Sequence, residues 1–189
     1  MPVTPAPETF VTLADAKAYM GIDPTVTTYD DLIQGLINAV TAHMEAKIAG
    51  PIKQRSFTDT YDGTGLQVLP LRHIPVQAVT QVTVDGQAVD ISQIYVYQSF
   101  LEYANGFFNQ GYKNVTVVAT VGWNPVPDDL VLACKKLVAI EFMKAPAGKN
   151  WLAQKSQTLS SPSGNLVSQF DPTEEDAIWK QIATYRQLL

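Results

Sequence analysis

Charged residues and cysteine are both scarce in this chain of 189 residues. Charged side chains make up 16% of the sequence, against about 25% in an average globular protein, and Cys134 is the single cysteine. One cysteine excludes an intrachain disulfide, and its apolar neighbours predict a buried structural thiol rather than a nucleophile. The polar surface therefore relies on uncharged groups such as Gln and Thr, which fits a surface committed to contacts with other subunits.

Several functional classes lack their usual sequence signals. No run of 18 apolar residues occurs, which excludes a membrane-spanning helix, and the first residues lack the regions of a secretory signal. The net charge is −5, and no basic cluster is longer than Lys135-Lys136, whereas a nucleic-acid binder normally shows a basic stripe. His43 and His73 do not have the spacing of a zinc site. We therefore expect no metal, no cofactor and no membrane contact.

Length and periodicity predict a single domain of the α+β class. About 150 residues is a common domain size, and the hydrophobic period changes from 3.6 to 2 and back along the chain. We expect a small antiparallel bundle of about four helices with an inserted antiparallel β-hairpin region. The expected parts are a flexible arm at 1–8, a helical pair at 9–50, a β region at 55–123, a central helix at 127–144, a long loop at 145–170 and a C-terminal helix at 171–189.

Capping residues mark the expected helix ends. Thr12 and Asp15 have a variant of the capping-box spacing, and Gly21 supplies a left-handed position after the first helix. Thr27-Thr28 precedes a second helix with a continuous apolar stripe. Pro127 lies near the start of the central helix, whose apolar residues cover more than one face. That helix should be the most buried one.

Alternating residues predict about five antiparallel strands in the β region. Asp62-Gly-Thr-Gly65 indicates a turn between a strand that begins near Phe57 and a return strand at 66–71. A second hairpin is expected around Asp85-Gly86, with strands at 76–84 and 88–97. The last strand, 114–123, alternates so that one face carries Val115, Val117, Ala119 and Val121.

The candidate catalytic residues all have simpler structural interpretations. Asp59 with Asp62, and Asp128 with Asp129, could serve as paired carboxylates for acid and base catalysis. The first pair is explained by a strand edge and a turn, and the second complements a helix dipole. No nucleophile, base and orienting group occur together, so we expect no enzyme. A small hydrolase that uses Asp59 or Asp128 is the remote alternative.

Aromatic residues are the stronger signal, since they crowd into residues 95–112. They either cover one face of the sheet or form a protein interface. The interface candidates in this region are Phe100, Tyr103, Phe107, Phe108 and Tyr112. A first set of interface candidates, for contacts with another protein or a neighbouring subunit, lies in the long loop and the terminal helix and consists of Trp151, Leu159, Phe170, Trp179, Tyr185, Arg186 and Leu189.

Five segments spread along the chain form an ordered set of motifs. The first is a threonine-led helix, Val11-Thr-Leu-Ala-Asp-Ala-Lys-Ala-Tyr-Met-Gly-Ile22, and the acidic start of a second helix follows at Asp30-Asp-Leu-Ile33 and Leu36-Ile-Asn-Ala-Val40. Residues 114–133 combine a strand, a Gly-aromatic turn and a Pro-Asp-Leu helix start, and the end, Ala183-Thr-Tyr-Arg-Gln-Leu188, contains a Tyr-Arg pair. In their order and spacing these segments resemble the phage head-tail connector (adaptor) proteins of the head completion type.

This resemblance implies a non-enzymatic ring, commonly of twelve subunits, that docks below the portal in the virion neck after assembly in the host cytoplasm. Such a ring extends the channel through which DNA leaves and offers a platform for a stopper or tail-terminator protein. The acidic balance agrees with DNA that passes through the lumen without specific binding. Another neck component, a stopper or a tail completion protein, is the alternative function.

Overall fold

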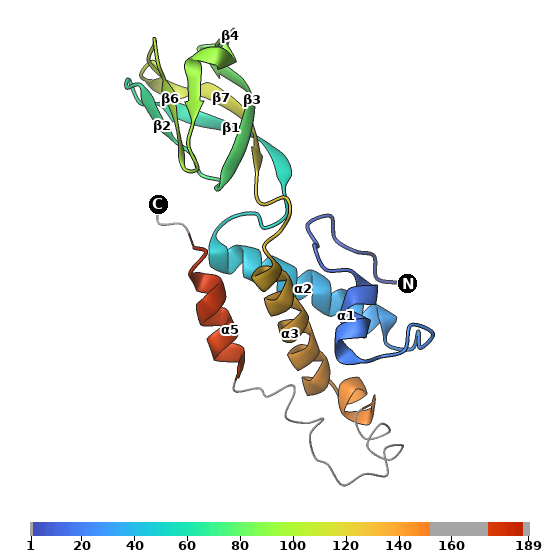
Figure 1. The fold of residues 1–189 in the computed structure, drawn as a ribbon. Helices are drawn as coiled ribbons and strands as arrows, with labels where there is room; N and C mark the ends of the chain where they lie inside the picture. The colour runs from blue at the N-terminus through green and yellow to red at the C-terminus, as the bar shows by residue number, and fades with distance from the viewer. Residues whose placement is uncertain (1, 152–173, 187–189) are drawn as a thin grey trace. The chain divides into compact units, whose positions relative to one another are not determined.

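The computed structural model describes residues 2–151 and 174–186 (Figure 1). The chain divides into two compact units, where the sequence predicted one domain. The helical unit is formed by described residues of Met1–Ile48 and Pro127–Arg186, and the β unit by those of Ala49–Val126. The division arises because the strands between Ile48 and Pro127 enclose a hydrophobic core of their own.

The helical unit follows the predicted helix boundaries closely except at the C-terminal helix, which was expected over 171–189 but ends at Ala183, with residues 184–186 outside the helix. Thr12 accepts a hydrogen bond from the backbone N–H of Asp15, Asp15 bonds back to Thr12, and Gly21 is left-handed with φ 67°, so both predicted caps are confirmed. Pro127 is the N-cap of the central helix rather than its first residue. The named helices of the unit are α1 (Leu13–Met20), α2 (Asp30–Ile48), α3 (Asp128–Lys144) and α5 (Glu174–Ala183).

The central helix α3 contacts α1, α2 and α5, which explains why its apolar residues are not confined to one face. Leu130, Leu137 and Phe142 are at most 1% exposed, as are Ile33 and Ile37 of α2. The predicted burial of α3 is therefore confirmed.

Two of the segments expected to lack structure are more ordered than their sequences indicate. The arm at residues 2–8 has no helix or strand, but it is hydrogen-bonded to α2. Residues 146–151, at the start of the expected long loop, are helical, and Trp151 is 9% exposed with its ring 6.3 Å from that of Phe142. The rest of the expected loop, residues 152–170, lies outside the described residues.

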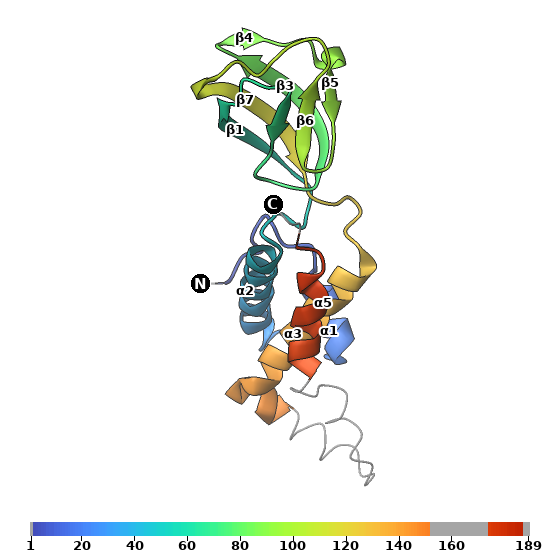
Figure 2. The ribbon, with the colours of Figure 1, turned by 90° about the vertical axis from the view of Figure 1, so that its left-hand side faces the viewer.

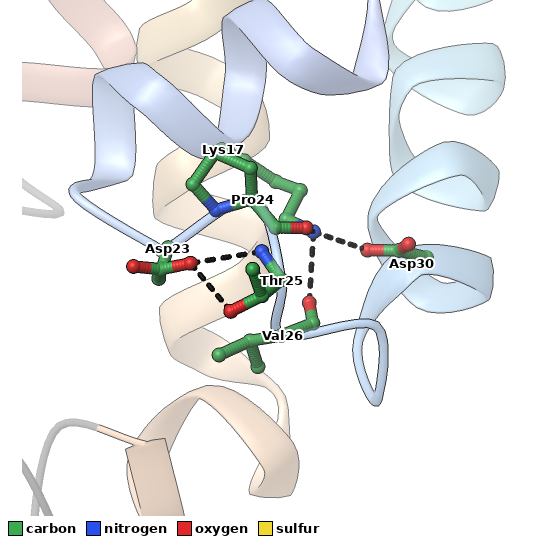
Figure 3. Close-up of polar contacts among 6 residues, drawn as sticks. All are labelled: Lys17, Asp23, Pro24, Thr25, Val26 and Asp30. Carbon is green, nitrogen blue, oxygen red and sulfur yellow. Dashed lines mark hydrogen bonds and ion pairs between the residues drawn. The ribbon is translucent and has the colours of Figure 1, made fainter.

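A buried lysine holds the loop between α1 and α2 (Figure 3). Lys17 Nζ donates hydrogen bonds to the backbone carbonyls of Pro24 and Val26, at 3.0 and 2.8 Å, and lies 2.8 Å from Oδ1 of Asp30. Its side chain is 4% exposed. Asp23 closes the same loop by accepting bonds from the N–H and hydroxyl of Thr25. A buried ammonium group thus finds three oxygen partners, as burial of a charge requires.

Two antiparallel sheets form the β unit, and Figure 2 shows them as two layers. The four-stranded sheet has the order β1-β7-β3-β4, and the three-stranded sheet has the order β2-β6-β5. A core lies between them and includes Val115, Val117, Ala119 and Val121, which confirms the predicted inward face of the last strand. The strands are β1 (Arg55–Gly63), β2 (Val68–Pro70), β3 (Val76–Val84), β4 (Gln87–Ala88), β5 (Ile94–Val96), β6 (Phe100–Tyr103) and β7 (Gly111–Val121).

The first predicted hairpin is wrong. Strand β1 pairs with β7, and β2 pairs with β6 in the other sheet, so residues 64–67, between β1 and β2, join two sheets. The N–H of Gly65 donates to the carbonyl of Phe108, and the N–H of Phe108 donates to Leu66, which ties the segment after the turn to a distant loop. Pairing with β7 also places Tyr61 in the core between the two sheets. A hairpin of β1 and β2 alone would have no second sheet to cover this side chain.

The second predicted hairpin is correct only at its turn. Asp85 and Gly86 have φ values of 51° and 77°, as a tight Asp-Gly turn requires, and β3 pairs with β4 across them. The return strand is two residues long, and the chain then crosses to the other sheet, where β5 pairs with β6. The crossing divides the expected strand 88–97 into β4 and β5, and β6 is a further strand that was not predicted, so the β unit has seven strands where about five were expected.

Candidate interaction surfaces

Tyr185, a member of the first set of interface candidates, lies against α3. The hydroxyl of Tyr185 lies 2.8 and 2.7 Å from the two carboxylate oxygens of Asp129 and donates to them. This hydrogen bond, with a smaller contribution from burial, raises the pKa of Tyr185 to about 12. Tyr185 is therefore a neutral donor at physiological pH, and it ties the residues after α5 to the first turn of α3.

Trp179 connects α5 to α2. Its ring centroid lies 4.4 Å from that of His43, and its indole N–H donates to Glu175 at 3.4 Å. Glu175 in turn lies 2.6 Å from Lys144 of α3, and this hydrogen bond lowers the pKa of Glu175, whereas hydrogen bonds to Glu141 and then to Glu175 raise the pKa of Lys144. Trp179 remains half-buried, so part of the indole stays available to another protein.

The other members of this set differ in their surroundings. Arg186 is exposed, whereas Trp151 is buried against Phe142. Leu159, Phe170 and Leu189 lie outside the described residues.

The outer face of the three-stranded sheet carries aromatic side chains. Cross-strand pairing places Val68, Glu102 and Tyr95 side by side on this face, and Tyr95 is 56% exposed. Phe100 stacks on Tyr97 with 4.3 Å between ring centroids, and the Tyr97 hydroxyl donates to Glu102. The hydroxyl of Tyr97 and the carboxylate of Glu102 thus bind each other, which leaves the ring surfaces to face outward.

A second group of exposed apolar side chains lies on the loops before β2 and after β6 and at the start of β7. Leu66, Phe107 and Tyr112 are 63%, 58% and 78% exposed, and we call them the loop-tip residues. Their segments are joined to the core through Phe108, which is fully buried, and Tyr103, which packs against the core. The candidates of residues 95–112 therefore divide between core and surface.

Side-chain hydrogen bonds fix the backbone beneath these loops. The amide of Asn114 donates to Asp85 and to the carbonyl of Asn109, and it accepts from the N–H of Gly63. Asn109 also donates to Asp85, and the two amides lower the pKa of that carboxyl group. Residues from three segments far apart in the sequence are held together here, which fixes the positions from which the loop-tip residues extend.

Three of the four carboxylates considered for catalysis, Asp59, Asp62 and Asp129, have structural partners. Asp59 accepts a hydrogen bond from the Tyr61 hydroxyl at 3.2 Å, and His73 Nε2 lies 3.4 Å away. These residues line a small hollow between Phe57 and the strands, and no Ser, Thr or Cys lines it. Asp62 accepts from the backbone N–H of Lys113 instead, so the two aspartates contact different groups.

The remaining chemistry-bearing groups in the described residues are equally structural. Cys134 is fully buried, and burial raises the pKa of its thiol to about 12, which confirms the predicted structural role. Among residues 2–151 and 174–186, no cluster of three or more His, Cys, Asp or Glu could hold a metal ion. No helix in that part of the chain has the length and apolar character needed to cross a membrane.

The fold combines a helical unit with a β unit that exposes aromatic side chains. The head completion protein family model matches residues 9–178. The chain therefore belongs to the head completion protein family, a family of structural virion proteins. No curated protein matches the chain.

Solved structures with a similar fold come from gene transfer agent (GTA) particles. One is from the virion of a native GTA particle, with 18% identity and a TM-score of 0.63. The others are from the neck of an empty particle, computed with C6 symmetry, and of a native particle, computed with C12 symmetry, with 15% and 16% identity and TM-scores of 0.60. In each case the match covers 100% of this chain and 95% of the other chain.

Proposed function

We propose that this protein is the head-tail adaptor of a tailed phage or phage-like particle. Copies form a ring, of twelve subunits, below the portal protein in the virion neck, after synthesis in the host cytoplasm. The ring extends the DNA channel and provides the docking platform for a stopper or tail-terminator protein. The observation that carries the proposal is the family match over residues 9–178, and the similar fold of chains from GTA necks supports it.

The exposed aromatic side chains support a role in assembly. Tyrosine and other aromatic residues are enriched in protein interfaces, where a few of them supply most of the binding free energy. Such residues reach the surface in both units: Trp179 of the helical unit is half-buried, and Tyr95, Phe107 and Tyr112 of the β unit are exposed. A subunit that contacts a portal, two neighbours and a tail component needs several separate surfaces of this kind.

The charge balance supports a channel that does not bind DNA. Double-stranded DNA attracts clustered Lys and Arg through its phosphates. The chain has 13 basic and 18 acidic residues, and no metal or other cofactor is needed for the proposed role. DNA can then slide through the lumen without being held.

Binding to portal tests the proposal. Full-length protein is mixed with purified portal, sedimented and imaged, and a rotationally symmetric complex is expected. Portal that fails to retain the protein would refute the adaptor role. A protein found only beyond the adaptor position in the particle would instead be a stopper or tail completion protein.

Two sets of substitutions separate the proposed surfaces. Trp179→Ala is expected to weaken portal attachment at least about tenfold, which is roughly 1.4 kcal/mol. Phe107→Ser with Tyr112→Ser is expected to leave portal attachment unchanged and to reduce attachment of the tail component. The melting temperature of each variant is the control, because loss of binding counts only if the fold is retained. Unchanged portal affinity of folded Trp179→Ala would remove α5 from the docking site.

A further inference from the structure

One face of α2 binds an extended peptide backbone. The amide group of Asn38 contacts two groups of the N-terminal arm: its Nδ2 donates to the carbonyl of Thr4 at 2.9 Å, and its Oδ1 accepts from the N–H of Ala6 at 3.1 Å. Two helical turns before Asn38, Asp31 Oδ1 accepts a hydrogen bond from the N–H of Val3 at 3.0 Å. We call Asp31, Gln34 and Asn38 the arm dock.

The arm dock is held in its binding geometry by the helical unit itself. Gln34 is 5% exposed, and its Nε2 donates to Oδ1 of Asn38 at 3.0 Å, which fixes the orientation of the Asn38 amide. The three residues lie on one helix face because their spacing is three and four. The three hydrogen bonds between the arm dock and the arm all involve backbone groups of the arm. The dock therefore recognises an extended chain and is indifferent to which copy supplies it.

The arm has the properties of a segment that can be exchanged. Residues 2–5 are exposed, so they add little to the core of their own subunit. Pro2, Pro5 and Pro7 restrict the backbone toward the extended polyproline conformation, which lowers the entropy lost on binding. The family match begins at residue 9, so the arm lies outside the matched region, whereas the dock lies inside it.

We propose that, in the assembled ring, the arm of each copy binds the arm dock of a second copy. The inference rests on the proposed ring and names one contact that joins its subunits. Exchange replaces each hydrogen bond by an identical one, so it costs no binding free energy, and neighbouring subunits gain a link. The contacting residues of the arm lie three to six residues before Thr9, a span of roughly 10–20 Å in the polyproline conformation, so exchange requires a neighbour whose arm dock lies within that distance of the base of the arm.

Cross-linking distinguishes exchange from binding within one chain. Full-length protein carrying Val3→Cys and Gly35→Cys is treated with a short thiol cross-linker, alone and in complex with portal. Gly35 lies on the dock face of α2, and a Cβ there would meet no atom within 4 Å, so the substitution fits. The natural Cys134 is fully buried and does not compete. Val3→Cys with Ala46→Cys, an exposed position two turns beyond the dock, is the matched control.

Exchange predicts a ladder of covalent multimers from the portal complex under denaturing conditions, and no ladder from the control. Complexes that yield only cross-linked monomers, or no cross-link at all, would overturn the exchange while leaving the ring intact. Failure to form any complex with portal would instead refute the proposed function, and the exchange with it.

A second experiment uses complementation between variants. One variant lacks residues 2–8, and the other carries Asp31→Ala and Asn38→Ala with an intact arm. Neither variant has a complete arm and dock within one chain, so binding within a chain predicts no rescue when they are mixed. Exchange predicts that the mixture enters portal complexes roughly tenfold better than either variant alone, or about 1.4 kcal/mol. Equal entry by the mixture and the single variants would contradict the proposal.

Discussion

Replacing Lys17 by methionine tests the energetic importance of the buried lysine. Methionine preserves most of the aliphatic volume of the side chain but removes the ammonium group. The carbonyls of Pro24 and Val26 then lose their donor, and the carboxylate of Asp30 loses its cation. The perturbation is confined to the loop between α1 and α2, at the edge of the helical unit.

The magnitude follows from the burial of the partners. Removing one member of a buried ion pair typically costs about 3–5 kcal/mol, because the other charge is left without compensation. The Asp30 side chain is 28% exposed and can regain some hydration, so the lower end of that range applies. We expect about 3 kcal/mol of lost stability, which for a chain of this size lowers the melting temperature by about 6–12 °C.

Chemical and thermal unfolding, followed by the far-UV signal of the helices, measure this loss. Lys47→Met is the matched control, because Lys47 lies in the last turn of α2 and is exposed. The control is expected to change stability by less than about 0.5 kcal/mol. A double-mutant cycle with Asp30→Asn should give a coupling energy above about 1 kcal/mol. Equal effects of Lys17→Met and Lys47→Met would show that the internal hydrogen bonds of Lys17 contribute nothing.

Three further predictions concern the contacts of α3, α5 and the β unit. Tyr185→Phe removes the donor to Asp129 and should destabilise the helical unit by about 1–2 kcal/mol in denaturant unfolding. The pKa of Glu175 is lowered and that of Lys144 is raised, so their contribution is lost as pH falls through the lowered value or rises through the raised one. Attachment of α5 should thus be strongest between about pH 5 and 10. Because both groups are partly hydrated, the gain in stability within this window should be less than about 1 kcal/mol. Lys144→Met should abolish this dependence in pH-scanned melting. Asn114→Ala should speed proteolysis at residues 105–111 while the helical signal is retained, and unchanged cleavage would contradict the role of its hydrogen bonds.

The helical unit was predictable because its signals are local. A capping box such as Thr12 with Asp15 brings its donors and acceptors together within one turn, so the sequence alone specifies them. The stripes of α2 and the all-round apolar pattern of α3 likewise follow from neighbouring residues. The burial of Lys17 could not be predicted in this way. Its hydrogen-bond partners lie on the following loop and helix, and they come close to Lys17 only after that loop has folded back.

Strand pairing was less predictable because it is not local. Alternation correctly identified the inward residues of β7, but the choice of partner depends on which segments meet in the finished sandwich. Strand β7 pairs with β1 on one side and β3 on the other, and both partners lie far away in the sequence. The motif Asp62-Gly-Thr-Gly65 lets the chain change direction in either arrangement. It could not decide whether β2 pairs with β1 or with β6.

The aromatic segment shows why composition alone left core and interface open. Phe107 and Phe108 are adjacent, yet the first is 58% exposed and the second is fully buried. Neighbouring residues of an extended segment point in opposite directions, so a crowded aromatic sequence supplies both the core and the surface. Which residue faces inward depends on the register that the loop adopts against Gly65 and Leu66.

The scarcity of charge in the β unit also has a structural explanation. Each of its acidic side chains accepts a hydrogen bond within the unit: Asp59 from Tyr61, Asp62 from Lys113, Asp85 from Asn109 and Asn114, Asp90 from Ser92, and Glu102 from Tyr97. These carboxylates fix turns and loop ends instead of forming a charged patch for a partner. What the unit presents outward is mainly hydroxyl, amide and aromatic surface, whose interactions fall off within contact distance. The proposed contacts of the β unit would therefore depend on shape and close packing rather than on charge.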